Sequence, residues 1–123
     1  MSKRRLKSTF ISKEKLTLDE FVQRMSEIPN HKIRARKLCW LKLIKADKLV
    51  CPVTNKRVTY CSLDEQQNRV RSLHYNFYSE DGAFMTIDHI HPKSKGGHNT
   101  SLDNIQPMET KANHKKGDKI LVS

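Results

Sequence analysis

The chain has 123 residues, of which 36% are hydrophobic and 30% charged, and its formal net charge is +11. This length predicts one small domain, with room for an arm at its start. No segment approaches the ~18 apolar residues of a membrane span, and the basic start lacks the apolar stretch of a signal peptide. We therefore expect a cytoplasmic protein without membrane contact. Three cysteines without paired spacing argue against a disulfide framework.

The positive charge lies entirely in the first half of the chain. Residues 1–61 hold 16 Lys and Arg against 5 Asp and Glu, whereas residues 62–123 hold 8 of each kind. Clustered cations bind polyanions by displacing counterions, without reading sequence. This distribution favours nucleic acid as the partner, and the alternative is a solvated surface that keeps the chain soluble.

The first predicted elements are an arm and a helix. Residues 1–16 are basic with scattered apolar side chains, which predicts a flexible arm. Thr17 and Glu20 have the spacing of a capping box, so a helix is expected from there to about Ile28. Pro29 ends that helix.

A second, basic helix is expected over about residues 31–47. Its apolar stripe is predicted to consist of Ile33, Leu38, Leu41 and Ile44. Trp40 is expected in the core. Residues 1–48 together predict a basic helical region that binds nucleic acid. The proposed phosphate contacts on this helix are Arg34, Arg36 and Lys37.

The middle of the chain predicts turns and strands. Residues 49–60 have the pattern of a short β-hairpin, and residues 62–71 are polar enough for a loop or helical turn. Two strand-like runs, residues 73–79 and 83–88, are separated by Glu-Asp-Gly, which is a hairpin turn signal. An α+β fold follows from this order of helices and strands.

The last part of the chain predicts a loop and a helix. Residues 92–103 are rich in Gly, Ser and Asn and are expected to form a loop. Pro107 fits the first turn of a helix and Gly117 its stop, so the helix should span about residues 107–116.

Residues 87–118 contain an Asp-His pair, a Gly-Gly pair, an Asp-Asn pair and a late Asn, in that order. Alternation along a strand places the side chains of Asp88 and His89 on opposite sides. Asn113, on the last helix, is able to reach the same cation as Asp88. A carboxylate and an amide oxygen fit Mg²⁺ or Mn²⁺, and a histidine of near-neutral pKa is able to accept a proton from water.

The strings DHIHPKSKGG, LDNIQ and NHKKGD resemble HNH nucleases of the Asp-His…Asn…Asn subtype, which have the ββα-metal fold. The resemblance covers about residues 77–118. It implies that Asp88 and Asn113 ligate one divalent cation and that His89 is the general base. In this family the residue matching Asn104 pins the loop, and we group it with the catalytic residues.

Further polar residues surround the motif. His91 lies two residues after His89 and shares its face on an extended backbone, and His114 follows Asn113, so both are possible site residues. Lysines in the motif suit phosphate contacts, although loop lysines are often only solvated. These lysines are Lys93, Lys95 and Lys116.

The chain departs from the family pattern at one place. Many HNH proteins carry two Cys-x-x-Cys pairs that bind a structural zinc. Here the first pair would be Cys51 and Thr54, and the second Glu109 and Ala112. We therefore expect no structural zinc.

The resemblance implies an HNH endonuclease at residues 49–123 that nicks or cuts DNA, most simply double-stranded DNA, with one divalent metal. Compact HNH proteins are often encoded by bacteriophages, and the host cytoplasm is then the expected location. A second interpretation is an inactive HNH scaffold that only binds nucleic acid. A third is an accessory subunit that docks on an acidic protein.

Overall fold

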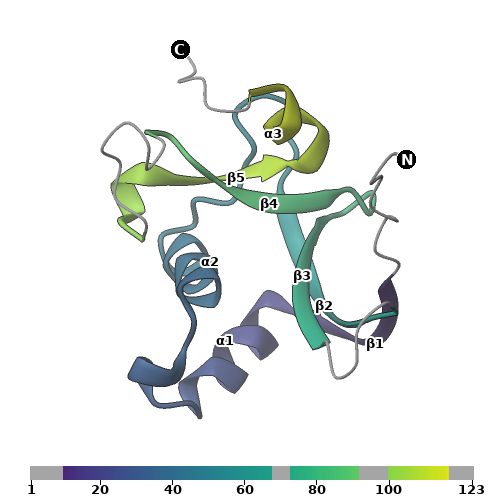
Figure 1. The fold of residues 1–123 in the computed structure, drawn as a ribbon, viewed down its shortest axis with the longest axis vertical. Coiled ribbons are helices and arrows are strands. Elements are labelled where there is room, and N and C mark those ends of the chain that lie inside the picture. Colours follow the sequence, from purple (N-terminus) through teal and green to yellow (C-terminus); the bar gives the residue numbers. More distant parts are fainter. Residues whose placement is uncertain (1–9, 68–72, 92–99, 117–123) are drawn as a thin grey trace, which may run out of the picture.

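The computed structural model describes residues 10–67, 73–91 and 100–116, except the side chains of His114 and Lys116. Its five strands form one antiparallel sheet in the order β1-β2-β3-β4-β5, accompanied by three α-helices (Figure 1). The elements are β1 (Phe10–Thr17), α1 (Leu18–Ser26), η1 (Asn30–Lys32), α2 (Ala35–Lys45), β2 (Val58–Gln66), β3 (Leu73–Ser79), β4 (Phe84–His89), η3 (Leu102–Asn104), β5 (Ile105–Glu109) and α3 (Thr110–Lys116). The predicted α+β class is confirmed.

The predicted start of α1 is confirmed by its hydrogen bonds. The Glu20 backbone N–H donates to Thr17 Oγ1 over 3.0 Å, and the Thr17 N–H donates to Glu20 Oε1 over 2.8 Å. These two bonds form the capping box and satisfy backbone donors that have no partner inside the helix. The apolar face of α1 buries Phe21 and Met25.

The prediction of a flexible arm is wrong for its described part. Residues 10–17 form β1, which pairs antiparallel with β2 and places Leu16 opposite Cys61. Residues 1–9 lie outside the described residues. Ser12 and Ser62 are hydrogen-bonded through their hydroxyl groups at 2.8 Å, and Leu16 is buried. An edge strand needs only a few inward residues because the ladder satisfies its backbone, so its sequence signal is weak.

The second helix is shorter than predicted, and its buried face is different. The prediction began at residue 31, but α2 begins at Ala35. The buried residues of α2 are Cys39, Trp40, Leu41 and Leu43, whereas two members of the predicted stripe, Leu38 and Ile44, are only half-buried. The predicted core position of Trp40 is confirmed, because its ring stacks on Phe77 with 4.3 Å between centroids.

Residues 62–66 of the polar run belong to β2, which corrects the prediction of a loop there, whereas residues 68–71 lie outside the described residues. Two polar side chains of this strand, Ser62 and Asp64, are buried in a hydrogen-bonded group rather than solvated. Asp64 accepts hydrogen bonds from Ser62 Oγ at 2.5 Å, Asn76 Nδ2 at 2.9 Å and the Tyr78 hydroxyl at 2.6 Å. Partners on the neighbouring strand β3 thus compensate the burial of a polar strand.

The predicted turn between residues 79 and 83 is confirmed, and the predicted hairpin at residues 49–60 is reduced to a turn closed by one β-bridge between Val50 and Arg57. Gly82 has a φ of +83° in the turn between β3 and β4, a conformation that glycine adopts without a steric cost. In the earlier turn the Cys51 N–H donates to the Lys56 carbonyl at 2.8 Å, and Asn55 has a positive φ of 62°. Asparagine tolerates that backbone region better than most residues.

The last helix begins later than predicted because a strand precedes it. Residues 105–109 form β5, where Pro107 lies opposite Ile87. Proline lacks an N–H, but β5 is the last strand of the sheet, where only one side needs ladder bonds. The helix α3 therefore has only seven residues and starts at Thr110. At this end of the sheet, β4 and β5 form an antiparallel pair, and α3 follows β5 directly.

One hydrophobic core joins the two halves of the chain. It includes Phe21 of α1, Trp40 of α2, Phe77 of β3 and Met108 of β5. The helix α1 packs on β1 and β2 and the helix α2 on β4 and β5, and both also contact Phe77 of β3 through Phe21 and Trp40. The helix α3 packs on β4 and β5 at the end of the sheet away from α1 (Figure 1). The division at residue 48 remains a prediction about function. In the described part of the chain, no helix has the length and apolar character needed to cross a membrane.

Candidate active site

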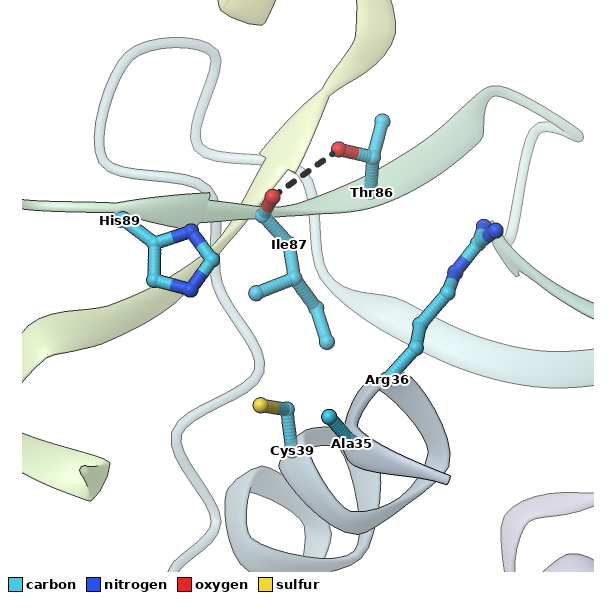
Figure 2. Close-up of a pocket in the computed structure, with 6 residues that line it drawn as sticks. All are labelled: Ala35, Arg36, Cys39, Thr86, Ile87 and His89. Carbon is cyan, nitrogen blue, oxygen red and sulfur yellow. Dashed lines mark hydrogen bonds between the residues drawn. The ribbon is translucent and has the colours of Figure 1, made fainter. Parts of the chain in front are cut away.

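The side chains of β4 alternate between two surroundings. In Figure 2, Ile87 and His89 point toward Ala35 and Cys39 of α2, whereas the Thr86 side chain points away from that helix. The residues around this open pocket of about 430 Å³ are Ala35, Arg36, Cys39, Thr86, Ile87 and His89. His89 is half-buried at its edge.

Asp88 points to the other side of β4, as alternation requires, and is only 4% exposed. Gln106 lies opposite it on β5 and donates a hydrogen bond from Nε2 to Asp88 Oδ2 over 2.8 Å. This bond orients a buried carboxylate one residue before His89.

Asn113 lies on the same side of β4 as Asp88. Its Nδ2 donates to the Thr86 hydroxyl over 2.9 Å, and Thr86 is two residues before Asp88 on the strand. At roughly 3.3 Å per residue, the two strand positions are about 7 Å apart on one face. The start of α3 is held by Thr110, whose hydroxyl donates to the Phe84 carbonyl at 3.0 Å.

Asn104 holds the chain that leaves β4. Its Oδ1 accepts the His91 N–H at 2.7 Å, and its Nδ2 donates to the His91 carbonyl at 3.0 Å. The Ile90 N–H also donates to the Asn104 carbonyl at 2.8 Å. Three hydrogen bonds thus fix the two residues that follow His89, and Asn104 itself is 6% exposed.

These residues lie inside a segment with a recognisable family pattern. The HNH endonuclease family matches residues 59–119, about half of the chain, from β2 through α3. The chain belongs to the HNH endonuclease family. No curated protein and no solved structure matches it. HNH endonucleases are nucleases that act on DNA and typically use a divalent metal.

Two lysines that the sequence analysis did not single out form hydrogen bonds with the backbone of the HNH motif. Lys42 Nζ donates to the Thr100 carbonyl at 2.6 Å, and Lys48 Nζ donates to the Leu102 carbonyl at 3.2 Å. Both come from α2 or the residues just after it, so the basic helix also positions the segment before Asn104. The sequence carries no local signal for such long-range contacts.

The other predicted site residues lie in several separate parts of the chain. Arg34, Arg36 and Lys37 gather at the first turn of α2. His91 is exposed. The two loop lysines, Lys93 and Lys95, lie outside the described residues, and the side chains of His114 and Lys116 are likewise not described.

The structure brings together three of the four positions at which the family pattern has zinc-binding cysteines, namely Cys51, Thr54 and Glu109. Cys51 Sγ accepts the Thr54 N–H at 3.4 Å and the Glu109 N–H at 3.5 Å. Lys56 Nζ forms an ion pair with Glu109 at 3.2 Å. Only one sulfur is present among the four positions. Across residues 10–67, 73–91 and 100–116, no group of three or more His, Cys, Asp and Glu side chains is placed to hold a metal.

Sequence reasoning missed two polar partners of the motif, Gln106 and Thr86. Gln106 is part of the LDNIQ string, and its pairing with Asp88 becomes visible only when residues 105–109 are recognised as a strand. Thr86 is signalled by its position two residues before Asp88, which places both on one face of the strand.

Proposed function

We propose that this HNH domain hydrolyses DNA phosphodiester bonds, with His89 as the general base and a divalent cation, Mg²⁺ or Mn²⁺, held by Asp88 and Asn113. The observation that carries the proposal is the position of Asn113. Its bond to Thr86 brings an amide from α3 to the side of β4 that carries the Asp88 carboxylate. A ββα-metal core of β4, β5 and α3 is part of this proposal.

The chemistry of the two proposed ligands fits a hard cation. A carboxylate and an amide carbonyl are oxygen ligands, which Mg²⁺ and Mn²⁺ prefer. Because Asn113 Nδ2 is engaged by Thr86, the carbonyl oxygen is the end of the amide left to coordinate. Burial of Asp88 also removes water from its carboxylate, which increases its attraction for a cation. When bound, the cation would neutralise charge on the phosphate and on the departing oxygen.

His89 supplies the proton acceptor in this proposal. Its imidazole takes a proton from a water molecule, whose oxygen then bonds to phosphorus while the bond to the 3′-oxygen breaks. The products are a 5′-phosphate and a 3′-hydroxyl, as in the family. Arg36 lines the same pocket as His89 and offers a positive charge to the substrate phosphate. Asn104 acts as a positioning residue because it holds the backbone just after His89.

The proposed DNA contacts come from the basic end of α2, where Arg34, Arg36 and Lys37 lie together. The motif lysines Lys93, Lys95 and Lys116 are proposed as further phosphate contacts on sequence grounds. Such contacts bind duplex DNA without reading its sequence.

The test is cleavage of supercoiled plasmid with Mg²⁺ or Mn²⁺ by the full chain and by His89→Ala. We expect nicked or linear product from the parent protein and a rate lower by roughly 10²–10⁴-fold for His89→Ala. His31→Ala is the matched control, because His31 is an exposed histidine on η1 and lies outside the HNH motif. A parent protein that binds DNA but cuts with neither metal would support the inactive scaffold instead.

A further inference from the structure

A second recess lies on the far side of the first turn of α2 from the candidate active site. It is an open groove of about 550 Å³ between α2 and β3, within the size range of small-molecule binding sites. The residues that line it are Arg34, Arg36, Lys37, Trp40, Leu73, His74 and Tyr75.

The cations that line this groove give it a net positive charge. Three of its lining residues are Arg34, Arg36 and Lys37, and none of its lining residues is acidic. Charge of one sign in a concave surface concentrates the counter-ion, so the groove favours a polyanion.

The rest of the groove lining is apolar or aromatic. Leu73 is 54% exposed, so its apolar side chain is open to a bound molecule. Tyr75 is half-buried, and an edge contact with Phe21 fixes the position of its ring. Lys37 Nζ lies 5.5 Å from the centroid of the same ring. Cations interleaved with aromatic rings bind unpaired nucleotides, since phosphates take the cations and bases take the rings.

Double-stranded DNA would contact the cations of this lining but leave its apolar and aromatic side chains largely without contacts. Its bases are stacked inside the helix, so duplex contacts with a basic surface are made mostly by phosphates. An unpaired base is free to enter a recess and cover Leu73 and Tyr75. The apolar part of the groove therefore favours a single strand over a duplex.

Arg36 connects this groove with the candidate active site. It lines both the groove and the pocket that contains His89. A strand seated in the groove therefore lies next to the pocket of His89, with Arg36 at the boundary between the two.

We propose that the groove between α2 and β3 binds a single-stranded DNA segment next to the bond that is cut, with bases against Leu73 and Tyr75 and phosphates on Arg34, Arg36 and Lys37. This inference rests on the proposed nuclease function, because it places the bound strand next to the bond that the nuclease cuts. Its preferred substrates are then DNA ends, flaps or gaps in place of uninterrupted duplex.

The binding test uses the full chain in EDTA, so that it is independent of cleavage. The chain has one tryptophan, Trp40, whose buried ring borders the groove, so its fluorescence is an indirect readout beside the direct signal of the labelled DNA. Labelled DNA of about 15 nucleotides, in the size range of single-strand sites, is titrated as single strand and as duplex. We expect the single strand to bind about tenfold more tightly and to change the Trp40 emission.

Three variants identify the contacts. Tyr75→Leu keeps bulk against Phe21 but removes the ring, and Leu73→Ser changes an exposed position that does not support the core. Each should weaken single-strand binding at least about fivefold, the lower end for loss of one stacked base, with less effect on duplex. Lys37→Gln should weaken both forms and reduce the salt dependence by about one charge. Lys45→Gln is the matched control, at the opposite end of the same helix.

The proposal is overturned if Tyr75→Leu and Leu73→Ser leave single-strand affinity unchanged, or reduce single-strand and duplex affinity equally. Tighter binding of RNA of the same sequence overturns the assignment to DNA. Thermal unfolding of each variant separates loss of binding from loss of fold. The plasmid assay is scored separately, so a groove that binds single strands in a chain that does not cut refutes only the proposed nuclease activity.

Discussion

Asn113 donates a hydrogen bond to Thr86, with 2.9 Å between Nδ2 and Oγ1. The bond connects α3 to β4 and orients an amide on the side of the strand where Asp88 is buried. The proposed metal site therefore depends on a hydroxyl group that is not itself a proposed ligand.

Thr86→Val should weaken cation binding, because it keeps the shape of the side chain but removes the hydroxyl that orients Asn113. Loss of such a supporting contact typically costs 10–100-fold in metal affinity. Calorimetric titration with Mn²⁺ measures this, with Thr86→Ser as the control that keeps the hydroxyl. Equal Mn²⁺ affinity in Thr86→Val and the parent protein would show that the amide is oriented by something else.

Asn104→Ala should destabilise the fold, since it leaves the His91 N–H and carbonyl without their side-chain partners. The expected loss is about 1–3 kcal/mol in the free energy of unfolding, measured by urea denaturation. Asn104→Asp retains the acceptor for the His91 N–H and should lose less. The idea fails if Ala and Asp variants unfold at the same urea concentration as the parent.

Asp64→Ala should be among the most destabilising substitutions in β2. It removes the shared acceptor of Ser62, Asn76 and Tyr78, and the buried Asn76 amide loses this partner, whereas Ser62 keeps its bond with Ser12. Burial and the bond to Asp64 also raise the pKa of Tyr78. We expect a loss of about 3 kcal/mol or more by urea denaturation.

Glu65→Ala is the matched control for Asp64→Ala, because Glu65 is the next residue but forms only a surface ion pair with Lys13. That pair is worth less than about 1 kcal/mol. Similar destabilisation by both substitutions would contradict the assigned role of the buried group.

Stability should decrease in acid partly through Asp81. The Ser79 hydroxyl and then the Lys56 ammonium lower the pKa of the Asp81 carboxyl from 3.8 to about 2. Because the folded pKa is below the unfolded one, this contribution is complete above about pH 4 and is lost as pH falls toward 2.

Asp81→Asn therefore should lower Tm at pH 6, and the difference from the parent should vanish near pH 2. Circular dichroism melts at several pH values measure it. A Tm difference that stays constant down to pH 2 would mean that Asp81 acts through packing and not through its charge.

The sequence by itself determined the local elements and the order of the motif residues. The capping box at Thr17 and the turn at Gly82 are encoded by a few adjacent residues, so no distant partner is needed to predict them. The HNH motif from Asp88 to Asn113 is likewise visible in the order and spacing of residue types.

The strands at residues 73–79 and 84–89 were visible in the sequence, but only the tertiary structure showed that residues 10–17, 62–66 and 105–109 are strands and which groups meet. Pro107 predicts a helix start locally, but pairing with Ile87 makes it part of β5. Asp64 predicts a solvated loop, but donors on β3 compensate its burial. Strand pairing and buried polar groups depend on partners far away in sequence, whereas caps and turns do not. The proximity of Arg36 and His89 could not be predicted from the sequence for the same reason, since it depends on the packing of α2 beside β4, which places both residues in one pocket.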